Sequence, residues 1–262
     1  MIISLLQTDI VWCNPQENIR RVEALMAGTD ASDLYVLPEM WVTGFVIDPV
    51  DNAEDEDTSV SLQWMRQTAH ERGCALSGSL SVRVADGSYR NRHYFVTPDA
   101  LYYYDKHHLF THGHEDRAYT AGQQAVIVEW KGWRWLLLTC YDLRFPVFSR
   151  YGVAGEYDGI IRVANWPERR QEAWHVLTRA RAMENQCYVV AVNRVGDDPV
   201  THYVGGSMVI DPVGRVVENL QETMSATTIS MPDITALQSI RQRFRVLDDR
   251  DQGPLMQNYM IE

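Results

Sequence analysis

The sequence has few cysteines and no long hydrophobic run, and both absences exclude classes of protein. Only four cysteines occur in 262 residues, and no two of them form a CxxC pair. This pattern argues against a disulfide framework or a zinc site and predicts a reduced chain in the cytoplasm. No apolar run approaches the roughly 18 residues that a membrane span needs. The first residues also lack the basic segment of a signal peptide, so we expect neither a membrane span nor a leader.

Positive charge is also scarce. The chain has 24 Lys and Arg residues against 35 Asp and Glu residues, which gives a formal net charge of −11. This balance argues against binding to nucleic acid or to an anionic membrane surface. A local basic site for a small acidic substrate remains compatible with it. The sequence contains no GxGxxG motif and no P-loop, so nothing in it supports nucleotide binding.

Predicted strands and helices alternate along the chain. The hydrophobic content of 45% is that of a globular protein. We predict helices over residues 15–27, 59–72, 168–186 and 233–244. Strands are predicted over 2–8, 33–38, 75–84, 89–97, 101–105, 125–130, 133–139, 157–164, 187–195, 203–210 and 215–218. Several of these strands form hairpins, and no Pro/Gly/Ser-rich linker divides the chain. The pattern favours a single α/β layered domain with mixed sheets.

Reactive side chains follow three of the predicted strands, which is where sites tend to gather in α/β proteins. The first is Glu39, in the segment Leu-Pro-Glu-Met that comes directly after an apolar strand. Partial burial there would raise the pKa of a carboxyl group toward the range of a general base. A solvated loop carboxylate explains this fragment at least as well when it is taken alone.

The second is Lys106, which ends the aromatic strand Tyr-Tyr-Tyr-Asp-Lys-His-His-Leu-Phe. Its ammonium group could stabilise an oxyanion in a pocket. The alternative is a lysine at a strand end that points into water. His107 and His108 are adjacent, so their side chains point in different directions, and no third ligand is apparent; we therefore predict no metal site here.

The third is Cys140, to which three leucines lead in the segment Leu-Leu-Leu-Thr-Cys-Tyr-Asp-Leu-Arg-Phe-Pro. A sharp turn after the strand would expose the sulfur beside free backbone N–H groups, as in a nucleophile elbow. A buried core cysteine is the alternative for this residue type. We assign that plainer role to Cys13, Cys74 and Cys187, since Cys74 and Cys187 adjoin apolar stretches without a nearby acid or base.

Together these three segments resemble the nitrilase (carbon–nitrogen hydrolase) superfamily. Glu39 precedes Lys106 by 67 residues, and Lys106 precedes Cys140 by 34, spacings that suit the family. The resemblance extends over nearly the whole chain. Its further marks are Gly44-Phe45, Asn91 after a hairpin, Ala164-Asn165-Trp166-Pro167 and Arg181-Ala182-Met183-Glu184-Asn185.

The resemblance implies a fold, an assembly and an activity. The fold is an α-β-β-α sandwich of two mixed sheets, formed by a single domain over residues 1–245 and followed by a tail at 246–262. Members of the family usually dimerise, so a homodimer or larger homo-oligomer is expected. The run Cys-Tyr-Asp-Leu-Arg-Phe-Pro is similar to that of the ω-amidases and deaminated-glutathione amidases. It implies hydrolysis of a small ω-amide such as 2-oxoglutaramate or 2-oxosuccinamate, with a deaminated-glutathione amidase as the alternative.

The resemblance also implies roles for individual residues. Cys140 is the nucleophile, Glu39 the general base and Lys106 an oxyanion partner; Glu115 supports the lysine. The expected substrate-binding residues are Tyr141, through its backbone N–H, and Phe45, Trp41, Asn165, Trp166 and Arg144. Arg144 either grips a substrate carboxylate or pairs with Asp142 as part of the scaffold, and the sequence leaves both open.

No metal or organic cofactor is expected, because the motifs supply a nucleophile, a base and a cation from side chains. The expected partner is a small-molecule amide. Two rivals are an isochorismatase-like hydrolase, which would use Asp, Lys and Cys, and a catalytically silent binding protein on the same fold. Glu39 in its Leu-Pro-Glu setting disfavours the first rival. The presence of Glu39, Lys106 and Cys140 together disfavours the second.

Overall fold

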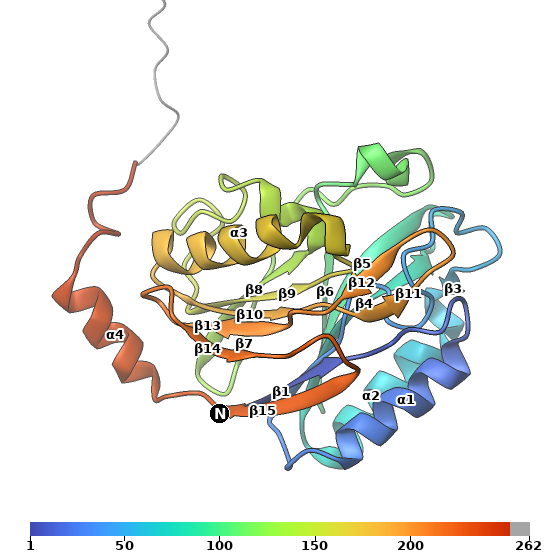
Figure 1. The fold of residues 1–262 in the computed structure, drawn as a ribbon, viewed down its shortest axis with the longest axis horizontal. Helices are drawn as coiled ribbons and strands as arrows, with labels where there is room; N and C mark the ends of the chain where they lie inside the picture. The colour runs from blue at the N-terminus through green and yellow to red at the C-terminus, as the bar shows by residue number, and fades with distance from the viewer. Residues whose placement is uncertain (252–262) are drawn as a thin grey trace, which may run out of the picture.

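Two β-sheets face each other at the centre of the molecule, with helices on the outer side of each. The computed structural model describes residues 1–251, so the part of the expected tail at 252–262 lies outside the described residues. Figure 1 shows the sheets roughly edge-on, with α1 and α2 on one side and α3 on the other. Among the described residues, no helix is long and apolar enough to cross a membrane.

The first sheet has a parallel centre and antiparallel flanks. Its strands lie in the order β15-β1-β2-β4-β5-β6, and β3 pairs with β4. The pairs β1–β2 and β2–β4 are parallel, whereas β15–β1, β4–β5 and β5–β6 are antiparallel. The bounds are β1 Ile2–Gln7, β2 Leu34–Val36, β3 Glu54–Asp55, β4 Ala75–Arg83, β5 Tyr89–Val96, β6 Leu101–Asp105 and β15 Ser225–Ser230.

The second sheet repeats this design. Its order is β14-β13-β10-β9-β8-β7, with β8, β9 and β10 parallel to one another and the outer strands antiparallel. The bounds are β7 Ile127–Trp130, β8 Trp133–Thr139, β9 Gly159–Val163, β10 Tyr188–Val192, β13 Met208–Ile210 and β14 Val216–Asn219. Both sheets are therefore mixed, as the sequence predicts.

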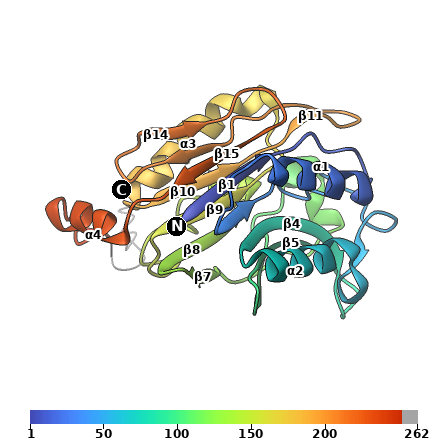
Figure 2. The ribbon, with the colours of Figure 1, turned by 90° about the horizontal axis from the view of Figure 1, so that it is seen from below.

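Three helices complete the outer layers, and local sequence sets their ends. Helix α1 (Pro15–Ala27) begins where the Asn14 side chain accepts a hydrogen bond from the Glu17 N–H, and α2 (Val60–Arg72) has Ser59 as its cap. These two helices cover the first sheet, while α3 (Gln171–Glu184) covers the second (Figure 2). Helix α4 (Ile234–Arg243) lies to one side of the layers (Figure 1) and buries Leu237 in the core between the sheets.

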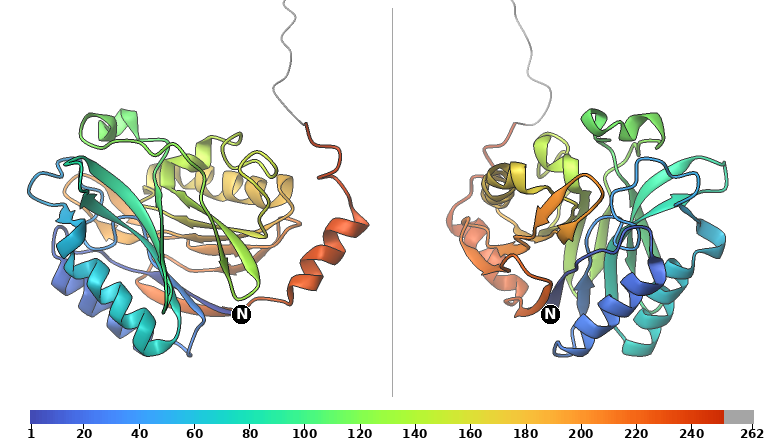
Figure 3. Two further views of the ribbon diagram at one scale, coloured as in Figure 1. Left: turned by 180° about the vertical axis from the view of Figure 1, so that it is seen from behind. Right: turned by 45° about the vertical axis from the view of Figure 1, so that its right-hand side comes forward.

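The hydrophobic core is divided by the sheets into layers, because side chains on a strand alternate between its two faces. On β9, Ile161 and Val163 point between the two sheets and pack with Leu137. Ile160 points the other way and packs with Trp174 beneath α3. A third apolar layer lies between the first sheet and α1 and α2. Figure 3 shows the resulting α-β-β-α sandwich, which confirms the expected fold.

Three predictions of secondary structure need correction. The strand expected over 203–210 is two strands, because Gly205 and Gly206 both adopt positive φ between them. Its first part, β12 (His202–Val204), pairs with β11 (Val195–Asp197) in a separate hairpin. The helix expected from 168 begins as a 3₁₀ turn over Glu168–Arg170 and becomes α-helical at Gln171. Strand β15 was missed.

Candidate active site

Glu39 is fully buried and held by three polar groups. It follows β2 by three residues, and its side chain is 0% exposed. Its Oε1 accepts hydrogen bonds from Lys106 Nζ and Asn91 Nδ2, both at 2.8 Å. Its Oε2 accepts one from the backbone N–H of Asn165 at 2.9 Å. The solvated loop carboxylate considered for this fragment is therefore excluded.

Lys106 lies directly after β6 and is as buried as Glu39. Its Nζ contacts Glu39 at 2.8 Å and Glu115 at 2.9 Å. Burial alone would lower the pKa of this amine, but the charges of Glu115 and Glu39 outweigh it and raise the pKa well above its usual value. Lys106 is therefore a permanent buried cation at neutral pH, and the alternative of a strand-end lysine in water is excluded.

Glu115 completes the charged cluster. It comes from the loop between β6 and β7, and its Oε1 accepts a hydrogen bond from Asn91 at 3.0 Å. Its Oε2 accepts one from the N–H of Phe110 at 2.6 Å. Burial raises the pKa of Glu115, against the opposing effect of Lys106. Asn91 on β5 donates to both carboxylates, so it fixes their separation around the ammonium group.

Cys140 sits on a sharp turn at the end of β8. Its backbone has φ = +44°, a left-handed conformation that non-glycine residues rarely adopt. The next residues form the 3₁₀ turn Cys140–Arg144, at whose start Asp142 Oδ2 accepts a hydrogen bond from the backbone N–H of Thr139 at 2.9 Å. The sulfur lies 3.9 Å from the carbonyl oxygen of Asn165. This geometry matches the expected nucleophile elbow.

The electrostatic surroundings keep the Cys140 thiol protonated at rest. Burial raises its pKa well above the usual value, and the negative charge of Glu39 raises it further, while Lys106 opposes both. A thiol in this state is a weak nucleophile and needs a base to remove its proton. Of the two glutamates in the cluster, Glu39 is the one whose charge acts on the pKa of this thiol.

Asp142 binds groups other than Arg144. Its Oδ1 accepts hydrogen bonds from the backbone N–H of His108 and contacts the His108 ring, and its Oδ2 accepts from the Tyr104 hydroxyl at 2.7 Å. Within residues 1–251, the Arg144 guanidinium forms no ion pair with Asp142 or with any other acid. It lies instead over the Trp166 ring, 5.1 Å from its centroid. The scaffold pairing of these two residues is excluded.

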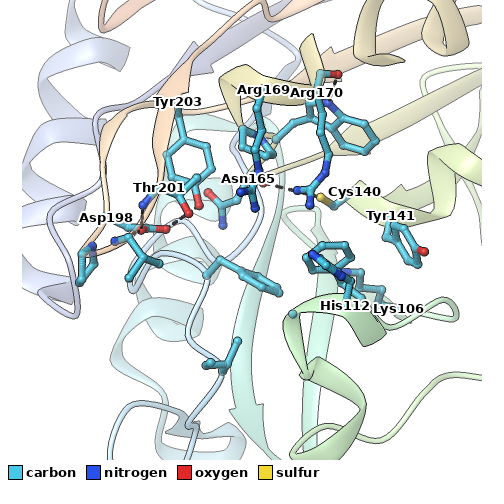
Figure 4. Close-up of a pocket in the computed structure, with 18 of the residues that line it drawn as sticks. Lys106, His112, Cys140, Tyr141, Asn165, Arg169, Arg170, Asp198, Thr201 and Tyr203 are labelled. Atoms are coloured by element: carbon cyan, nitrogen blue, oxygen red, sulfur yellow. Dashed lines mark hydrogen bonds between the residues drawn. The ribbon is translucent and has the colours of Figure 1, made fainter. Parts of the chain in front are cut away.

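An open pocket of about 380 Å³ leads to Cys140. Figure 4 shows Cys140 and Tyr141 at one side of it and Asp198, Thr201 and Tyr203 at the other. The lining residues come from loops after strands of both sheets and from the β11–β12 hairpin. They are Trp12, Phe45, Ile47, Lys106, Phe110, His112, Gly113, Cys140, Tyr141, Arg144, Asn165, Trp166, Pro167, Arg169, Arg170, Asp198, Pro199, Val200, Thr201 and Tyr203.

Five of the six predicted substrate-binding residues line this pocket. They are Phe45, Tyr141, Arg144, Asn165 and Trp166. Trp41 does not, and its prediction as an apolar pocket wall is wrong. Its ring is fully buried and packs against Trp64 at 5.3 Å, in the layer between the first sheet and its helices. Trp41 lies two residues after Glu39, and the chain there turns its side chain into the core.

Sequence reasoning missed several pocket residues and one residue of the charged cluster. Asn91 is one of the marks of the family resemblance, but its sequence context does not indicate that it bonds both glutamates. Arg169 and Arg170 follow the segment Asn165-Trp166-Pro167 directly, and this proximity was the available signal. Tyr203 comes from a hairpin that the sequence did not reveal.

A family model matches most of the chain. The model described as carbon-nitrogen hydrolase matches residues 2–242. This range contains Glu39, Lys106 and Cys140 together with the remaining pocket residues.

Individual relatives are similar over almost their whole length. The chain is 39% identical to the omega-amidase YafV of Yersinia enterocolitica, over 97% of this chain and 98% of the relative. It is 33% identical to the 2-oxoglutaramate amidase of Bacillus subtilis, over 94% and 96%. Among solved structures, a CN-hydrolase superfamily protein of Xanthomonas campestris with an arsenic adduct in its active site shares 42% identity. It matches with a TM-score of 0.92, over 98% of this chain and 99% of that one.

Proposed function

This chain belongs to the carbon–nitrogen hydrolase family, and from that premise we propose that it hydrolyses a small ω-amide to a dicarboxylate and ammonia. The relatives named omega-amidase and 2-oxoglutaramate amidase support this choice within the family. The observation that carries it is the buried cluster at the pocket: Glu39 and Lys106 are in direct contact at 2.8 Å, and Cys140 lines the same pocket. A nucleophile, a base and a cation for an oxyanion thus meet in one place.

The first half of the proposed reaction forms a thioester. Glu39 accepts the proton of the Cys140 thiol as the sulfur attacks the amide carbon of the substrate. The carbonyl oxygen becomes an oxyanion, which the Lys106 ammonium and the backbone N–H of Tyr141 stabilise. When the tetrahedral intermediate collapses, the C–N bond breaks and protonated Glu39 gives its proton to the departing nitrogen. Ammonia leaves, and the acyl group remains on the sulfur.

The second half returns the enzyme to its starting state. Glu39, now a carboxylate again, accepts a proton from a water molecule that attacks the thioester carbon. The same oxyanion donors stabilise the second intermediate. The C–S bond then breaks, Glu39 returns its proton to the sulfur, and the carboxylate product leaves. Nucleophile, base and cation are all side chains of this protein, so we propose that no metal or organic cofactor takes part.

Asn165 offers a hydrogen-bond acceptor that suits the amide nitrogen of a substrate. Its backbone N–H donates to Glu39 Oε2 at 2.9 Å, and its side-chain Nδ2 donates to the backbone carbonyl of Glu39 at 2.8 Å. Its Oδ1 is buried and has no hydrogen-bond partner within the described part of the chain, although the residue lines the pocket. A buried acceptor without a donor is costly, and an N–H of the substrate amide would satisfy it. We therefore place Asn165 at the leaving group.

Ammonia release from a panel of amides tests the proposed function. The panel contains 2-oxoglutaramate, 2-oxosuccinamate, deaminated glutathione, a neutral aliphatic amide and a nitrile. We expect the two 2-oxo ω-amides to have the highest kcat/KM. The substrate assignment fails if the neutral amide or the nitrile is turned over with a higher kcat/KM than both of them.

Glu115→Gln should slow turnover without preventing folding. The substitution keeps the shape of the side chain but removes the charge that faces Lys106 at 2.9 Å. Because a hydrogen bond to a charged group contributes about 1.5–3 kcal/mol, we expect kcat to fall about 10- to 100-fold. KM should change little, since Glu115 does not line the pocket. Asp116→Asn, at the exposed neighbouring position, is the control, and an equal loss of kcat in both variants would contradict the role of Glu115.

Arg144→Lys should weaken the binding of acidic substrates. A planar guanidinium can hold a carboxylate through two parallel hydrogen bonds, whereas lysine offers a single point charge. We expect KM for 2-oxoglutaramate to rise about tenfold, which corresponds to about 1.4 kcal/mol. The melting temperature should stay within about 1 °C, because the guanidinium is exposed and loses no acidic partner within residues 1–251. A fall in thermal stability with an unchanged preference for acidic amides would instead mean a structural role.

We also propose a homodimer that works in the cytoplasm. The assembly rests on the family resemblance, and the compartment is supported by four cysteines that are all free. Light scattering of the purified protein should give about twice the chain mass of 30.1 kDa. A monomeric mass at micromolar concentration would contradict the proposed assembly.

A further inference from the structure

Three guanidinium groups of the pocket have no acidic partner in the part of the chain that the structure describes. Arg144, Arg169 and Arg170 all line the pocket. Over residues 1–251, none of the three side chains forms an ion pair or a hydrogen bond. Most other arginines of this protein do form such contacts; Arg92, for example, binds Glu56 and Asp105 together. Three like charges around one cavity repel one another, and a bound anion would relieve this repulsion.

Arg170 is the best placed of the three to meet a substrate. Its backbone is fixed by two hydrogen bonds: its N–H donates to the Pro167 carbonyl, and its own carbonyl accepts from the Trp166 indole at 2.8 Å. Its guanidinium lies 4.9 Å from the centroid of the Phe110 ring. In Figure 4 the side chains of Arg169 and Arg170 point into the pocket on the side of Asn165 and Cys140. The guanidinium is thus held near the nucleophile by packing rather than by an acid.

The pKa of the Arg170 guanidinium reflects the nearby positive charges. Burial lowers the pKa of its guanidinium, and the charges of Arg169 and Arg144 lower it further. The group is still fully charged at neutral pH, because an arginine begins so far above it. An incoming carboxylate would therefore gain from three cations at once, and an incoming ammonium would be repelled by all three.

Among the described residues, one acidic side chain lines the pocket, and it lies away from Arg170 (Figure 4). Asp198 lies on the far side, next to Tyr203 (Figure 4). Its Oδ1 accepts hydrogen bonds from the backbone N–H groups of Val200 and Thr201, and its Oδ2 accepts from the Tyr203 hydroxyl at 2.6 Å. These bonds hold the tip of the β11–β12 hairpin together. The carboxylate of Asp198 therefore forms hydrogen bonds within the hairpin, whereas the three guanidinium groups form none within the described residues.

We propose that Arg170, together with Arg144 and Arg169, selects ω-amides that carry a carboxylate and rejects those that carry an ammonium group beside it. This inference rests on the proposed amide hydrolysis. In it, Arg170 and Arg144 hold the substrate carboxylate, and Arg169 at the exposed rim attracts it. The same charges exclude amino-acid amides such as glutamine, whose carboxylate is accompanied by a positive charge. The enzyme thereby does not hydrolyse glutamine but hydrolyses the corresponding amide that lacks the amino group.

Three amides of one chain length test this selection. Pentanamide is neutral, the monoamide of glutaric acid adds a carboxylate, and L-glutamine adds an ammonium group to that acid. For the wild type we expect kcat/KM for glutaric monoamide to exceed that for each of the other two by at least about tenfold. In Arg170→Gln, the preference for glutaric monoamide over pentanamide should fall at least about tenfold. Its preference over glutamine should also fall, because one repulsive charge is gone.

Two further variants make the result interpretable. Arg170→Lys keeps the charge and should retain an intermediate preference over glutamine. Arg72→Gln removes an exposed arginine at the end of α2, far from the pocket, and should leave all three kcat/KM values unchanged. Melting temperatures of all variants show whether each is folded; the backbone bonds of Arg170 do not involve the side chain that is replaced.

The possible outcomes separate this inference from the proposed function. If the wild type releases ammonia neither from any of the three amides nor from 2-oxoglutaramate, the proposed hydrolysis itself is wrong. If it hydrolyses pentanamide or glutamine as well as glutaric monoamide, hydrolysis stands and the selection is wrong. The selection is also wrong if Arg170→Gln keeps both wild-type preferences, or if Arg72→Gln changes them equally.

Discussion

Cys140→Ala is expected to abolish amide hydrolysis while the protein stays folded. The substitution removes the only thiol that lines the pocket of the described structure, so no thioester can form. By comparison with other enzymes that lose their nucleophile, kcat should fall by at least about 10⁴-fold. Stability should change little, because the sulfur makes only a weak contact at 3.9 Å with the Asn165 carbonyl. Ammonia release and a thermal melt measure the two effects.

The other cysteines of the chain are matched controls with the opposite behaviour. Cys74 and Cys187 are fully buried in apolar layers, and burial raises the pKa values of their thiols to about 11 and about 12. Their alanine variants should lose stability but keep kcat. A stoichiometric amount of iodoacetamide should label Cys140 before Cys13, which is partly exposed and whose pKa burial raises. Near-normal turnover in Cys140→Ala would refute the proposed mechanism.

Glu39→Gln is expected to have the second largest effect on kcat. Glutamine keeps the volume of the side chain but cannot accept the thiol proton, so both halves of the reaction lose their base. General acid–base catalysis contributes about 10²–10⁴-fold, and we expect kcat to fall by this amount. KM should change far less, because proton transfer belongs to the transition state. Alkylation of Cys140 should also become slower, and a variant that altered only KM would contradict the role of Glu39.

Lys106→Met should reduce both activity and stability, and a second substitution separates the two. Loss of the ammonium group removes an oxyanion donor, which in comparable sites costs roughly 10²–10³-fold in kcat. It also leaves the buried carboxylates of Glu39 and Glu115 without a counter-charge, a change that costs about 3–5 kcal/mol in similar buried pairs. Adding Glu115→Gln should restore much of the stability, since only one buried charge then remains. It should not restore kcat, and recovery of turnover would mean that Lys106 is only structural.

The sequence carried more information about the chemistry than about the pocket. Glu39, Lys106 and Cys140 each follow a strongly apolar or aromatic strand, and such strands are easy to recognise from local composition. Sites in α/β proteins gather after the ends of strands, and the family resemblance assigns these three residues to one site. The structure brings them together and adds Asn91, which bonds both glutamates.

Residues on irregular segments were harder to predict. Trp41 was expected in the pocket because it is aromatic and close to Glu39, but it is a core residue packed on Trp64. The direction of a side chain after a strand depends on the turn that follows. Met40 next to it adopts φ = +42°, a conformation that residue propensities do not predict for methionine. Strand β15 was missed for a related reason: its half-buried residues become a strand only by pairing with β1.

The sequence by itself determined the layered fold, the family and the identity of the three residues proposed for catalysis. Each of these can be predicted from short segments of the sequence, namely the alternating strands and helices and the motifs that follow three strands. The tertiary structure decided what the charged side chains bind. Asp142 could have paired with Arg144 but is taken by His108 and Tyr104 from another part of the chain. Arg144 is consequently left facing the cavity with no acidic partner among the described residues. Such pairings depend on distances between remote segments, and these distances exist only once the two sheets have packed together.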